Sequence, residues 1–532
     1  MISAQQLETL APEVREAVLS LMAEVAARDD QLRAKDALID KREREVAFKQ
    51  VVIDKLTHEM AVLKRLKFAA QSEKFVGNAE QRSLLEDALD TDLAELGEEM
   101  KRLGVDVDAE DVTSAKKTPR RENLPENLPR RDVHHEPAVT VCGCGCQMQR
   151  IGEDVAEKLD YLPGVFSVER HVRGKWACRR CEKLVQAPVP AHVIDKGIPT
   201  TGLLAQVLVA KFLDHLPLYR QQAVFERAGM VIARSTLAQW VGQCGAQLQP
   251  LVQALGEELR RHMVLHADET PVAMLKPGNG KTHRATMWSY CTTSHNPTKA
   301  VVFEFSETRS GQNVREFLRL DTADAWRGTL VTDGFSGYHA CVEKGVSSAQ
   351  CMAHARRKFH ELWVNHKSEV GRQALRFYQA LFRIEREIEE LSSEDRRRIR
   401  QRKSRRVLAV FHRWLIAKRQ LVPPGSASAK AIDYSLKRWA ELTRFLADGD
   451  VPISNNWVEN HIRPVALGRA NWLFAGSLRA GRRAAAIMSL LHTARINGHE
   501  PYAYIKDVLE RLPTHPNSRI DELLPHRWAP AT

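Results

Sequence analysis

Hydrophobic residues recur with a seven-residue period near the start of the chain. Residues 14–66 contain neither proline nor glycine and are rich in Ala, Leu, Glu, Lys and Arg, which favours one long helix. One heptad column is apolar throughout, and the column three residues later is basic at its centre. This pattern predicts a coiled coil, and the alternative is a solvated helix lying on its own protein. The columns are Val18, Val25, Leu32, Ile39, Val46, Ile53 and Met60, and Leu21, Arg28, Lys35, Arg42, Lys49, Leu56 and Leu63.

Apolar stretches in the middle of the chain predict buried β-strands. In the first, residues 264–275, apolar residues lead into Asp268 and Glu269, so we predict a buried strand with a carboxylate at its end. The turn-forming sequence KPGNGK soon follows. THRATMWSYCTT and KAVVFEFSET come next, a helix is predicted at SGQNVREFLRL, and GTLVTDGFSGYHACV contains a strand that ends at Asp333. SAQCMAHARRKFHELW then passes from strand into a basic helix. This order predicts a mixed sheet with acids at the ends of two strands, although a carboxylate at a strand end more often caps a turn.

Helical patterns precede and follow these strands. Residues 198–260 and the highly charged residues 355–450 are predicted to be mostly helical. A later helix is predicted to begin near Ser454 and to end near Pro464, with Glu459 in its first turns, where an acid complements the helix dipole. Residues 77–131 contain an acidic helical piece and then a stretch rich in proline and arginine, and the range is predicted to be a flexible basic linker.

Length and charge narrow the class of protein. A chain of 532 residues predicts three or four domains. Its net charge of +12 predicts a polyanionic partner, nucleic acid rather than membrane, because no apolar run approaches the roughly 20 residues needed to span a bilayer. The first residues, MISAQQLETLAPEVRE, have neither the basic region nor the apolar core of a signal peptide. We therefore expect a cytoplasmic protein.

Basic residues concentrate in one segment. Eight of the eleven residues from Arg396 to Arg406 are Lys or Arg. This density favours contacts with phosphates, which supply affinity rather than sequence selection. Basic residues beside the predicted acids have the same role, so that the expected DNA contacts are Arg356, Arg357, Lys358, Arg463, Arg469, Arg396, Arg398 and Arg402.

The cysteines predict a metal site. Five of nine cysteines fall between Cys142 and Cys181, in VCGCGCQM and WACRRCEKL, a spacing that suits zinc in a reducing cytosol better than disulfides. Two thiolates from each cluster would together form one closed structural Zn²⁺ site, and the residues between the two clusters would form a β-hairpin. The predicted ligands are Cys142, Cys144, Cys178 and Cys181, with Cys146 as an alternative ligand.

Longer blocks of sequence carry a family resemblance. HADETPV, TDGFSGY, CMAHARRKF, NNWVENHIRPVALGRANWLFAGS and INGHEPYAYIKDVL resemble the transposases of the insertion sequence 66 family, and the likeness covers nearly the whole chain. The resemblance implies a DDE transposase with a ribonuclease-H-like catalytic core and a helical insertion before the last acid. By position, Asp268 matches the family's first acid, Asp333 its second and Glu459 its third.

The resemblance also implies a cofactor and marks two departures. The three carboxylates are expected to hold two catalytic Mg²⁺ ions, for which Mn²⁺ can substitute, whereas Glu269 should face the opposite side of its strand. Cys351 and His354 match a C-x-x-H element, for which core packing is expected rather than metal. This chain has Ser454 where the family usually has Asp, and Gly334 where the family often has Asp or Ala.

The predicted function is that of a DNA transposase that binds the ends of an insertion sequence, cleaves them and joins the 3′ ends to target DNA. The alternatives are a metal-dependent DNA nuclease and a noncatalytic DNA-binding accessory protein. Expected partners are element-end and target DNA, a second copy through the coiled coil, and accessory proteins of the same element, with no membrane. A bacterial protein associated with the nucleoid is implied.

The fold class predicted from these patterns and from the resemblance is multidomain α+β. It comprises an N-terminal long helix or coiled coil, a small zinc-binding β module and a ribonuclease-H-like mixed α/β core with a helical insertion. The predicted domains are a coiled-coil region 1–76, a basic linker 77–131, a zinc module 132–197, a helical segment 198–260 that braces the core or binds DNA, a catalytic domain 261–495 with its insertion at about 355–450, and a helical tail 496–532.

Overall fold

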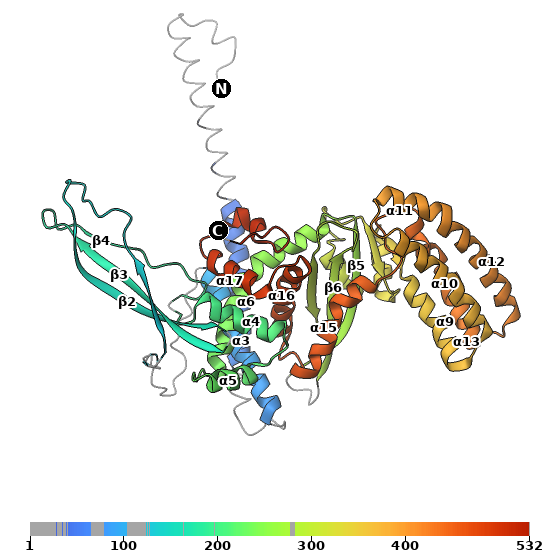
Figure 1. Cartoon of the computed structure of the whole chain (residues 1–532), viewed down its shortest axis with the longest axis horizontal. Coiled ribbons are helices and arrows are strands. Elements are labelled where there is room, and N and C mark those ends of the chain that lie inside the picture. Colours follow the sequence, from blue (N-terminus) through green and yellow to red (C-terminus); the bar gives the residue numbers. More distant parts are fainter. Residues whose placement is uncertain are drawn as a thin grey trace, which may run out of the picture. The chain divides into compact units, whose positions relative to one another are not determined.

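A computed structural model describes residues 28, 35, 39, 41–64, 79–103, 124, 126, 128–162, 164–195, 197–276 and 282–530. The chain forms two compact units (Figure 1). The first comprises Met1–Arg65 and Glu99–Thr113, and the second comprises Leu66–Glu98 and Ser114–Thr532.

The first unit contains a helix over residues 41–64. Leu56, Met60 and Leu63 are buried, whereas Ile39 and Val46 are 52% and 65% exposed. Within the described residues, the apolar columns are therefore buried only toward the C-terminal end of the helix. Most heptad positions before residue 35 lie outside the described residues, so the coiled coil stays a prediction.

A four-stranded sheet surrounds the cysteine clusters in the second unit. The strands are β1 (Arg130–His135), β2 (Gln149–Leu162), β3 (Val165–Ala177) and β4 (Leu184–Gln186). β2 and β3 form the long antiparallel hairpin that the pattern predicted, β1 pairs with β3 in parallel, and β4 pairs with the end of β3. The hairpin therefore separates the two cysteine clusters in sequence, while its open end brings them together.

A mixed five-stranded sheet forms the centre of the second unit. Its strands are β5 (Val264–Met274), β6 (His283–Thr292), β7 (Val301–Ser306), β8 (Thr329–Thr332) and β9 (Ser347–Gln350), in the order β7-β6-β5-β8-β9. The first three pair antiparallel, and β8 and β9 add in parallel. Between β7 and β9 lie α7 (Gly311–Phe317), η1 (Ser336–Tyr338) and α8 (His339–Glu343). The predicted order of strands and helices is confirmed.

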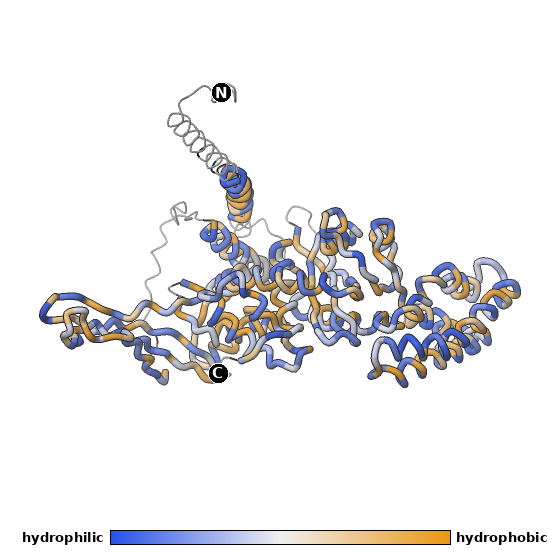
Figure 2. The backbone as a smooth tube through the Cα atoms, turned by 90° about the horizontal axis from the view of Figure 1, so that it is seen from above, coloured by the Kyte–Doolittle hydropathy of each residue, from blue (hydrophilic) through white to orange (hydrophobic). Residues whose placement is uncertain are grey.

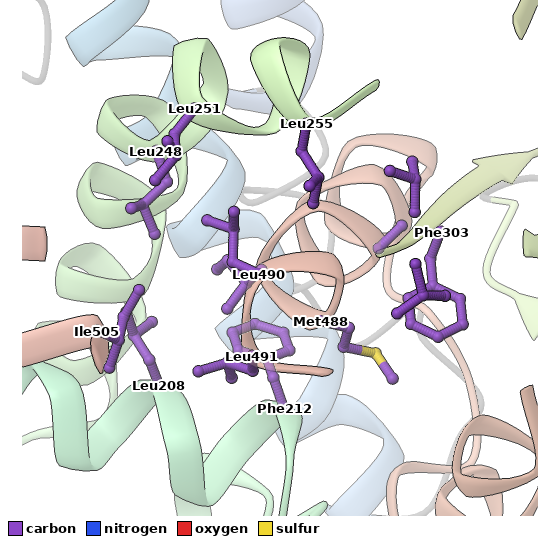
Figure 3. Packing of buried hydrophobic residues seen from close by; sticks show 14 of the residues in the cluster. Leu208, Phe212, Leu248, Leu251, Leu255, Phe303, Met488, Leu490, Leu491 and Ile505 are labelled. Carbon is purple, nitrogen blue, oxygen red and sulfur yellow. The ribbon is translucent and has the colours of Figure 1, made fainter. Parts of the chain in front are cut away.

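Helices far apart in the sequence share one apolar core beside this sheet. They are α4 (Thr201–Phe212), α5 (Leu218–Arg227), α6 (Arg234–Arg260), α16 (Leu478–Ile496) and α17 (Pro501–Arg511), followed by η4 (Asn517–Leu523). Figure 3 shows leucines of α4, α6 and α16 meeting here, with Phe303 of β7 at one side. Ser489 and Thr493 of α16 accept hydrogen bonds from the backbone of β7, at 2.8 and 3.1 Å. These bonds attach α16 to the strand at the end of the sheet.

The insertion after β9 is entirely helical and has a core of its own. It comprises α9 (Met352–His366), α10 (Glu369–Glu387), α11 (Ser393–Ile399), the π-helical turn η2 (Arg400–Ser404), α12 (Arg405–Leu421), α13 (Ala427–Lys437), α14 (Trp439–Leu442) and η3 (Arg444–Leu446). Phe359, Tyr378 and Phe411 are fully buried in its core. The helical character predicted for residues 355–450 is confirmed.

The helix that carries Glu459 is longer than predicted. α15 spans Asn456–Trp472 and continues through Pro464, where an end had been predicted. A proline inside a helix removes one backbone hydrogen bond and costs about 3 kcal/mol. Val458 and Val465, on either side of the proline, are both fully buried. Tertiary packing of these residues therefore outweighs the local penalty.

The range predicted as a linker differs from the structure at its beginning. Residues Ala79–Arg102 form helix α3, and its Asp92 and Glu95 are buried against Arg483 of α16 at 2.9 and 2.6 Å. Acidic residues looked solvated in the sequence because their cationic partner lies almost 400 residues away. Residues 104–123 lie outside the described residues.

The hydropathy of the residues matches this arrangement of sheet and helices (Figure 2). Apolar positions concentrate on the central sheet and on the helices that share its core. No helix in the described part of the chain combines the length and apolarity needed to cross a bilayer.

Candidate functional site

Four cysteines meet at the open end of the β2–β3 hairpin. The sulfur atoms of Cys142, Cys144, Cys178 and Cys181 all lie within 4.8 Å of one another. Two thiolates bound to one tetrahedral Zn²⁺ at about 2.3 Å stand roughly 3.8 Å apart. The distance between the Cys144 and Cys178 sulfurs is 3.8 Å, that between Cys144 and Cys181 is 4.0 Å, and that between Cys142 and Cys181 is shorter, at 2.8 Å. The donor set thus fits a structural zinc ion.

Local backbone geometry favours the thiolate form of Cys178, whereas the neighbouring thiols raise the pKa values of Cys144 and Cys181. Backbone N–H groups of Cys181 and Arg180 lower the pKa of Cys178 to about 6, as expected for a C-x-x-C turn that wraps around its first sulfur. Cys146, the alternative ligand, is not part of the group of four. The four predicted ligands are therefore the ones that the fold gathers.

The strands that lead to the first two acids are neighbours in the sheet. β5 and β8 pair in parallel with Val264 opposite Thr329 and His266 opposite Val331. Asp268 and Asp333 therefore follow the paired residues in the same direction along the two strands, and the charge of Asp333 contributes to the raised pKa of Asp268.

Asp333 is held by the turn that follows β8. Its Oδ1 accepts a hydrogen bond from the backbone N–H of Phe335 at 2.9 Å, and its carbonyl accepts one from the Tyr434 hydroxyl of α13 at 3.2 Å. Gly334 has φ = +90°, and a Cβ there would lie 2.9 Å from Oε1 of Gln350. Glycine suits this left-handed turn, so Gly334 is compatible with the position of Asp333.

Asn455 attaches the helix that bears the third acid to the strand that bears the first. It is fully buried as the N-cap residue of α15. Its Oδ1 lies 2.7 Å from Nδ1 of His266, and its Nδ2 donates to the carbonyl of Ala267 at 3.1 Å. His266 shares a face of β5 with Asp268, so this face is the one on which α15 packs. Asn455 therefore fixes the start of α15 four residues before Glu459.

The carboxylate of Glu459 is turned toward α9. Its Oε1 lies 3.7 Å from Nδ1 of His354, and its Oε2 lies 3.8 Å from Arg357. Among the described residues, the carboxylate oxygens of the three predicted acids do not all lie within 4.8 Å of one another. One potential ligand atom from each of Cys351, His354 and Glu459 does lie within this distance of the others. The three acids interact through their charges, as the pKa of Asp268 shows.

Burial, together with the negative charges of Glu269, Asp333 and Glu459, raises the pKa of Asp268 to about 8. A buried carboxylate that repels its neighbours in this way is a suitable ligand for a hard divalent cation, because the cation offsets both burial and repulsion. The donor set therefore fits Mg²⁺.

Glu269 has different partners. It accepts hydrogen bonds from Arg309 and from the Tyr338 hydroxyl, the latter at 2.5 Å, and its side chain is 2% exposed. Its carboxylate is therefore engaged in the protein interior.

The stability of the metal-free protein should decrease between pH 6 and pH 8 because of Asp268. The folded chain holds a proton that the unfolded chain releases above its ordinary pKa near 4, so stability is lost as pH rises toward the raised pKa. The loss is about 2 kcal/mol over this interval. Urea unfolding of Asp268→Asn in EDTA should show a correspondingly weaker pH dependence. Parallel profiles for both proteins would contradict the assignment of the shift.

The predicted DNA-contact residues divide into exposed and buried ones. Arg356, Arg357, Lys358, Arg463, Arg469, Arg398 and Arg402 are exposed. Arg396 is buried and donates to the carbonyl of Gly449 and to Asp450, at 2.8 and 3.0 Å, so its predicted role in DNA contact is wrong. Density of charge in the sequence did not distinguish it from its exposed neighbours.

Two functionally placed residues were missed from the sequence, His266 and Asn455. Their contact joins residues 189 positions apart. The available signal was their adjacency to Asp268 and Glu459 in HADET and NNWVE, which cannot say that the two segments touch.

Fold and sites together define a multidomain α/β protein with a cysteine cluster that is compatible with a zinc module. Four family models match the chain. They are the transposase IS66 family over residues 196–483, the IS66 C-terminal element over 489–526, the zinc-finger binding domain of transposase IS66 over 140–182, and transposase C of IS166 homeodomain over 55–133. The chain belongs to the IS66 family of transposases, as its motifs predicted, and these domains indicate a transposase that binds DNA.

Similar proteins occur in Sinorhizobium fredii (strain NBRC 101917 / NGR234). Uncharacterized protein y4qI is 34% identical over 532 aligned residues, which cover 96% of each chain. Uncharacterized protein y4hP is 36% identical over 78% of each chain. Uncharacterized protein y4jD is 36% identical over 76% of this chain and 81% of its own length.

Proposed function

We propose that this protein is a DDE-type transposase that cleaves the ends of its element and joins the 3′ ends to target DNA. Asp268, Asp333 and Glu459 are the catalytic acids of this proposal. The observation that carries it is the parallel pairing of β5 with β8, the strands that lead to Asp268 and Asp333, with the helix of Glu459 attached to β5 through Asn455.

The core is proposed to be ribonuclease-H-like. Three antiparallel strands followed by two parallel strands, in the order β7-β6-β5-β8-β9, support this assignment. The helical insertion between β9 and α15 then corresponds to the insertion before the last acid. The predicted domains remain part of the proposal, with α3 added to the core.

The chemistry requires negative charge to be stabilised on a phosphodiester and on two oxygens. Two Mg²⁺ ions bound by Asp268, Asp333 and Glu459 would supply this stabilisation, and Mn²⁺ can substitute. In this proposal, the pairing of β5 positions Asp268 and the turn at Gly334 positions Asp333. The contacts of Asn455 position the helix that carries Glu459. Water as nucleophile gives end cleavage, and the freed 3′-hydroxyl as nucleophile gives strand transfer.

Exposed basic residues near the acids would hold the DNA backbone. Arg356, Arg357 and Lys358 project from the first turns of α9, the helix against which Glu459 lies. Arg463 and Arg469 lie on α15 itself. Such contacts are expected to supply affinity that decreases with salt. Self-association through the predicted coiled coil would bring two element ends together, and accessory proteins of the same element are further proposed partners.

The test is incubation of the full-length protein with labelled candidate element ends and Mg²⁺ or Mn²⁺, scoring nicking and the joining of a pre-cleaved end separately. Nicking together with joining supports the proposal. Nicking without joining would identify a nuclease instead, and binding without either reaction would identify a noncatalytic DNA-binding protein.

A further inference from the structure

Cys351, His354 and Glu459 form a second group of potential metal ligands outside the zinc module. One donor atom of each lies within 4.8 Å of the others. Cys351 is the N-cap residue of α9 and is 1% exposed, His354 follows in the first turn of α9, and Glu459 comes from α15. A thiolate, an imidazole and a carboxylate make a donor set that suits Zn²⁺ and related transition metals rather than Mg²⁺.

Two of these donor atoms lack hydrogen-bond partners. Nδ1 of His354 and Oε1 of Glu459 are both buried, and no hydrogen bond reaches either atom although they face each other at 3.7 Å. Leaving a buried polar atom unsatisfied costs about 1–3 kcal/mol. Two ligands of one tetrahedral Zn²⁺, bound at about 2.0–2.1 Å, stand roughly 3.4 Å apart. The observed separation is thus close to that of two ligands sharing an ion.

The third donor has the backbone surroundings of a metal-binding cysteine. The N–H of Asn455 donates to the sulfur of Cys351 at 3.1 Å, and the N–H groups of His354 and Ala353 also contact it. Burial nevertheless raises the pKa of Cys351 to about 11, against the lowering effect of these N–H groups. In the zinc module, Cys178 has the equivalent contacts, from the second and third residues after it. The C-x-x-H turn at Cys351 therefore repeats the local arrangement of the C-x-x-C turn at Cys178.

We propose that Cys351, His354 and Glu459 bind a second zinc ion, or a transition-metal ion of similar preference. The fourth coordination position would be open to water, because His354 is 21% exposed and gives the site access to solvent. The ion would tie the start of α9 to α15. This site would share Glu459 with the proposed catalytic acids, whereas Cys351 and His354 belong to this site alone. It replaces the expectation of simple core packing at Cys351 and His354.

The experiment measures zinc per chain in the full-length protein. The protein is saturated with Zn²⁺ in excess Mg²⁺ and desalted, and bound zinc is determined by mass spectrometry. The wild-type protein should hold two ions per chain, and His354→Ala should hold one. His360→Ala, which changes an exposed histidine of the same helix outside the group, is the matched control and should hold two. Cys178→Ser with Cys181→Ser should lose the other ion and hold one.

Two further measurements guard against loss of folding as an explanation. His354→Cys retains a ligating group and should hold two ions, which a purely structural histidine would not require. Co²⁺ substitution should give a sulfur-to-metal charge-transfer band that persists in the double serine variant and disappears when His354→Ala is added to that variant. One ion in the wild-type protein, or two in His354→Ala, would overturn the proposal. Asp333→Asn should still hold two ions, so failure of the transposase proposal would not affect this result.

Discussion

Asp333→Asn should abolish DNA cleavage and joining while leaving DNA binding intact. The substitution keeps the size and the turn of Asp333 but removes one anionic ligand from the acid cluster at the edge of β5 and β8. Metal ions stabilise such a transition state by several kcal/mol, so losing an anionic ligand is expected to reduce the cleavage rate by about 10³-fold. Cleavage of labelled element ends is measured together with their binding in a gel-shift assay at fixed salt.

The matched control for this substitution is Asp321→Asn. Asp321 is exposed and forms an ion pair with Lys344 at 2.9 Å. It lies between β5 and β8 in sequence and is not one of the proposed catalytic acids. Cleavage by this variant should equal that of the wild-type protein. Undiminished cleavage by Asp333→Asn would remove Asp333 from the proposed triad, and loss of DNA binding would point to a structural defect instead.

Much of the central sheet was predictable from the sequence because each strand is an apolar run bounded by turn residues. Asp333 follows the end of β8 as predicted, whereas Asp268 lies in the middle of β5, because that strand continues past its predicted end to Met274. Their relative position was not predictable, because it depends on the parallel register that pairs Val264 with Thr329. A shift of one residue would send the two side chains to opposite faces.

Long-range contacts account for the features that the sequence left open. In the sequence, Asp92 and Glu95 look like solvated acids of a linker. In the structure, both form ion pairs with Arg483. Pro464 predicts the end of a helix, but the helix continues because Val458 and Val465 are buried on either side of the proline. The zinc ligands were easier to predict, because the short C-x-C and C-x-x-C spacings determine the local geometry of each pair. Pairing of β2 with β3 is then enough to bring the two pairs together.

Arg400→Ala should destabilise the helical insertion more than any exposed substitution in the same basic run. Arg400 is fully buried in the π-helical turn η2, and its guanidinium donates to Glu385 at 2.6 Å and to the carbonyls of Phe445, Asp448 and Val451 at 3.1, 2.9 and 3.0 Å. Removing it leaves the half-buried carboxylate of Glu385 and several carbonyls without their cationic partner. Breaking a buried ion pair on one side costs about 3–5 kcal/mol.

Hydrogen exchange can measure this effect locally, where a single unfolding midpoint would average over several domains. A loss of 3–5 kcal/mol corresponds to amide exchange roughly 150 to 4,000 times faster across α10, α12 and residues 445–453. Arg402→Ala, two residues away on the exposed side of the same turn, should leave exchange unchanged. Unchanged exchange in Arg400→Ala would show that the carbonyls find other partners.

The effect of Arg400→Ala should extend to the acid cluster because the carbonyls that Arg400 holds lie just before α15 in the chain. Val451 is only four residues before Asn455, and the intervening Ile453 accepts a backbone hydrogen bond from Met352 at the start of α9. Loosening this segment releases the N-terminus of α15, and with it the contact between Asn455 and His266. The variant should therefore cleave DNA more slowly although Arg400 touches no predicted acid. A positive charge in the densest basic run of the sequence would then act by orienting the site rather than by contacting phosphates.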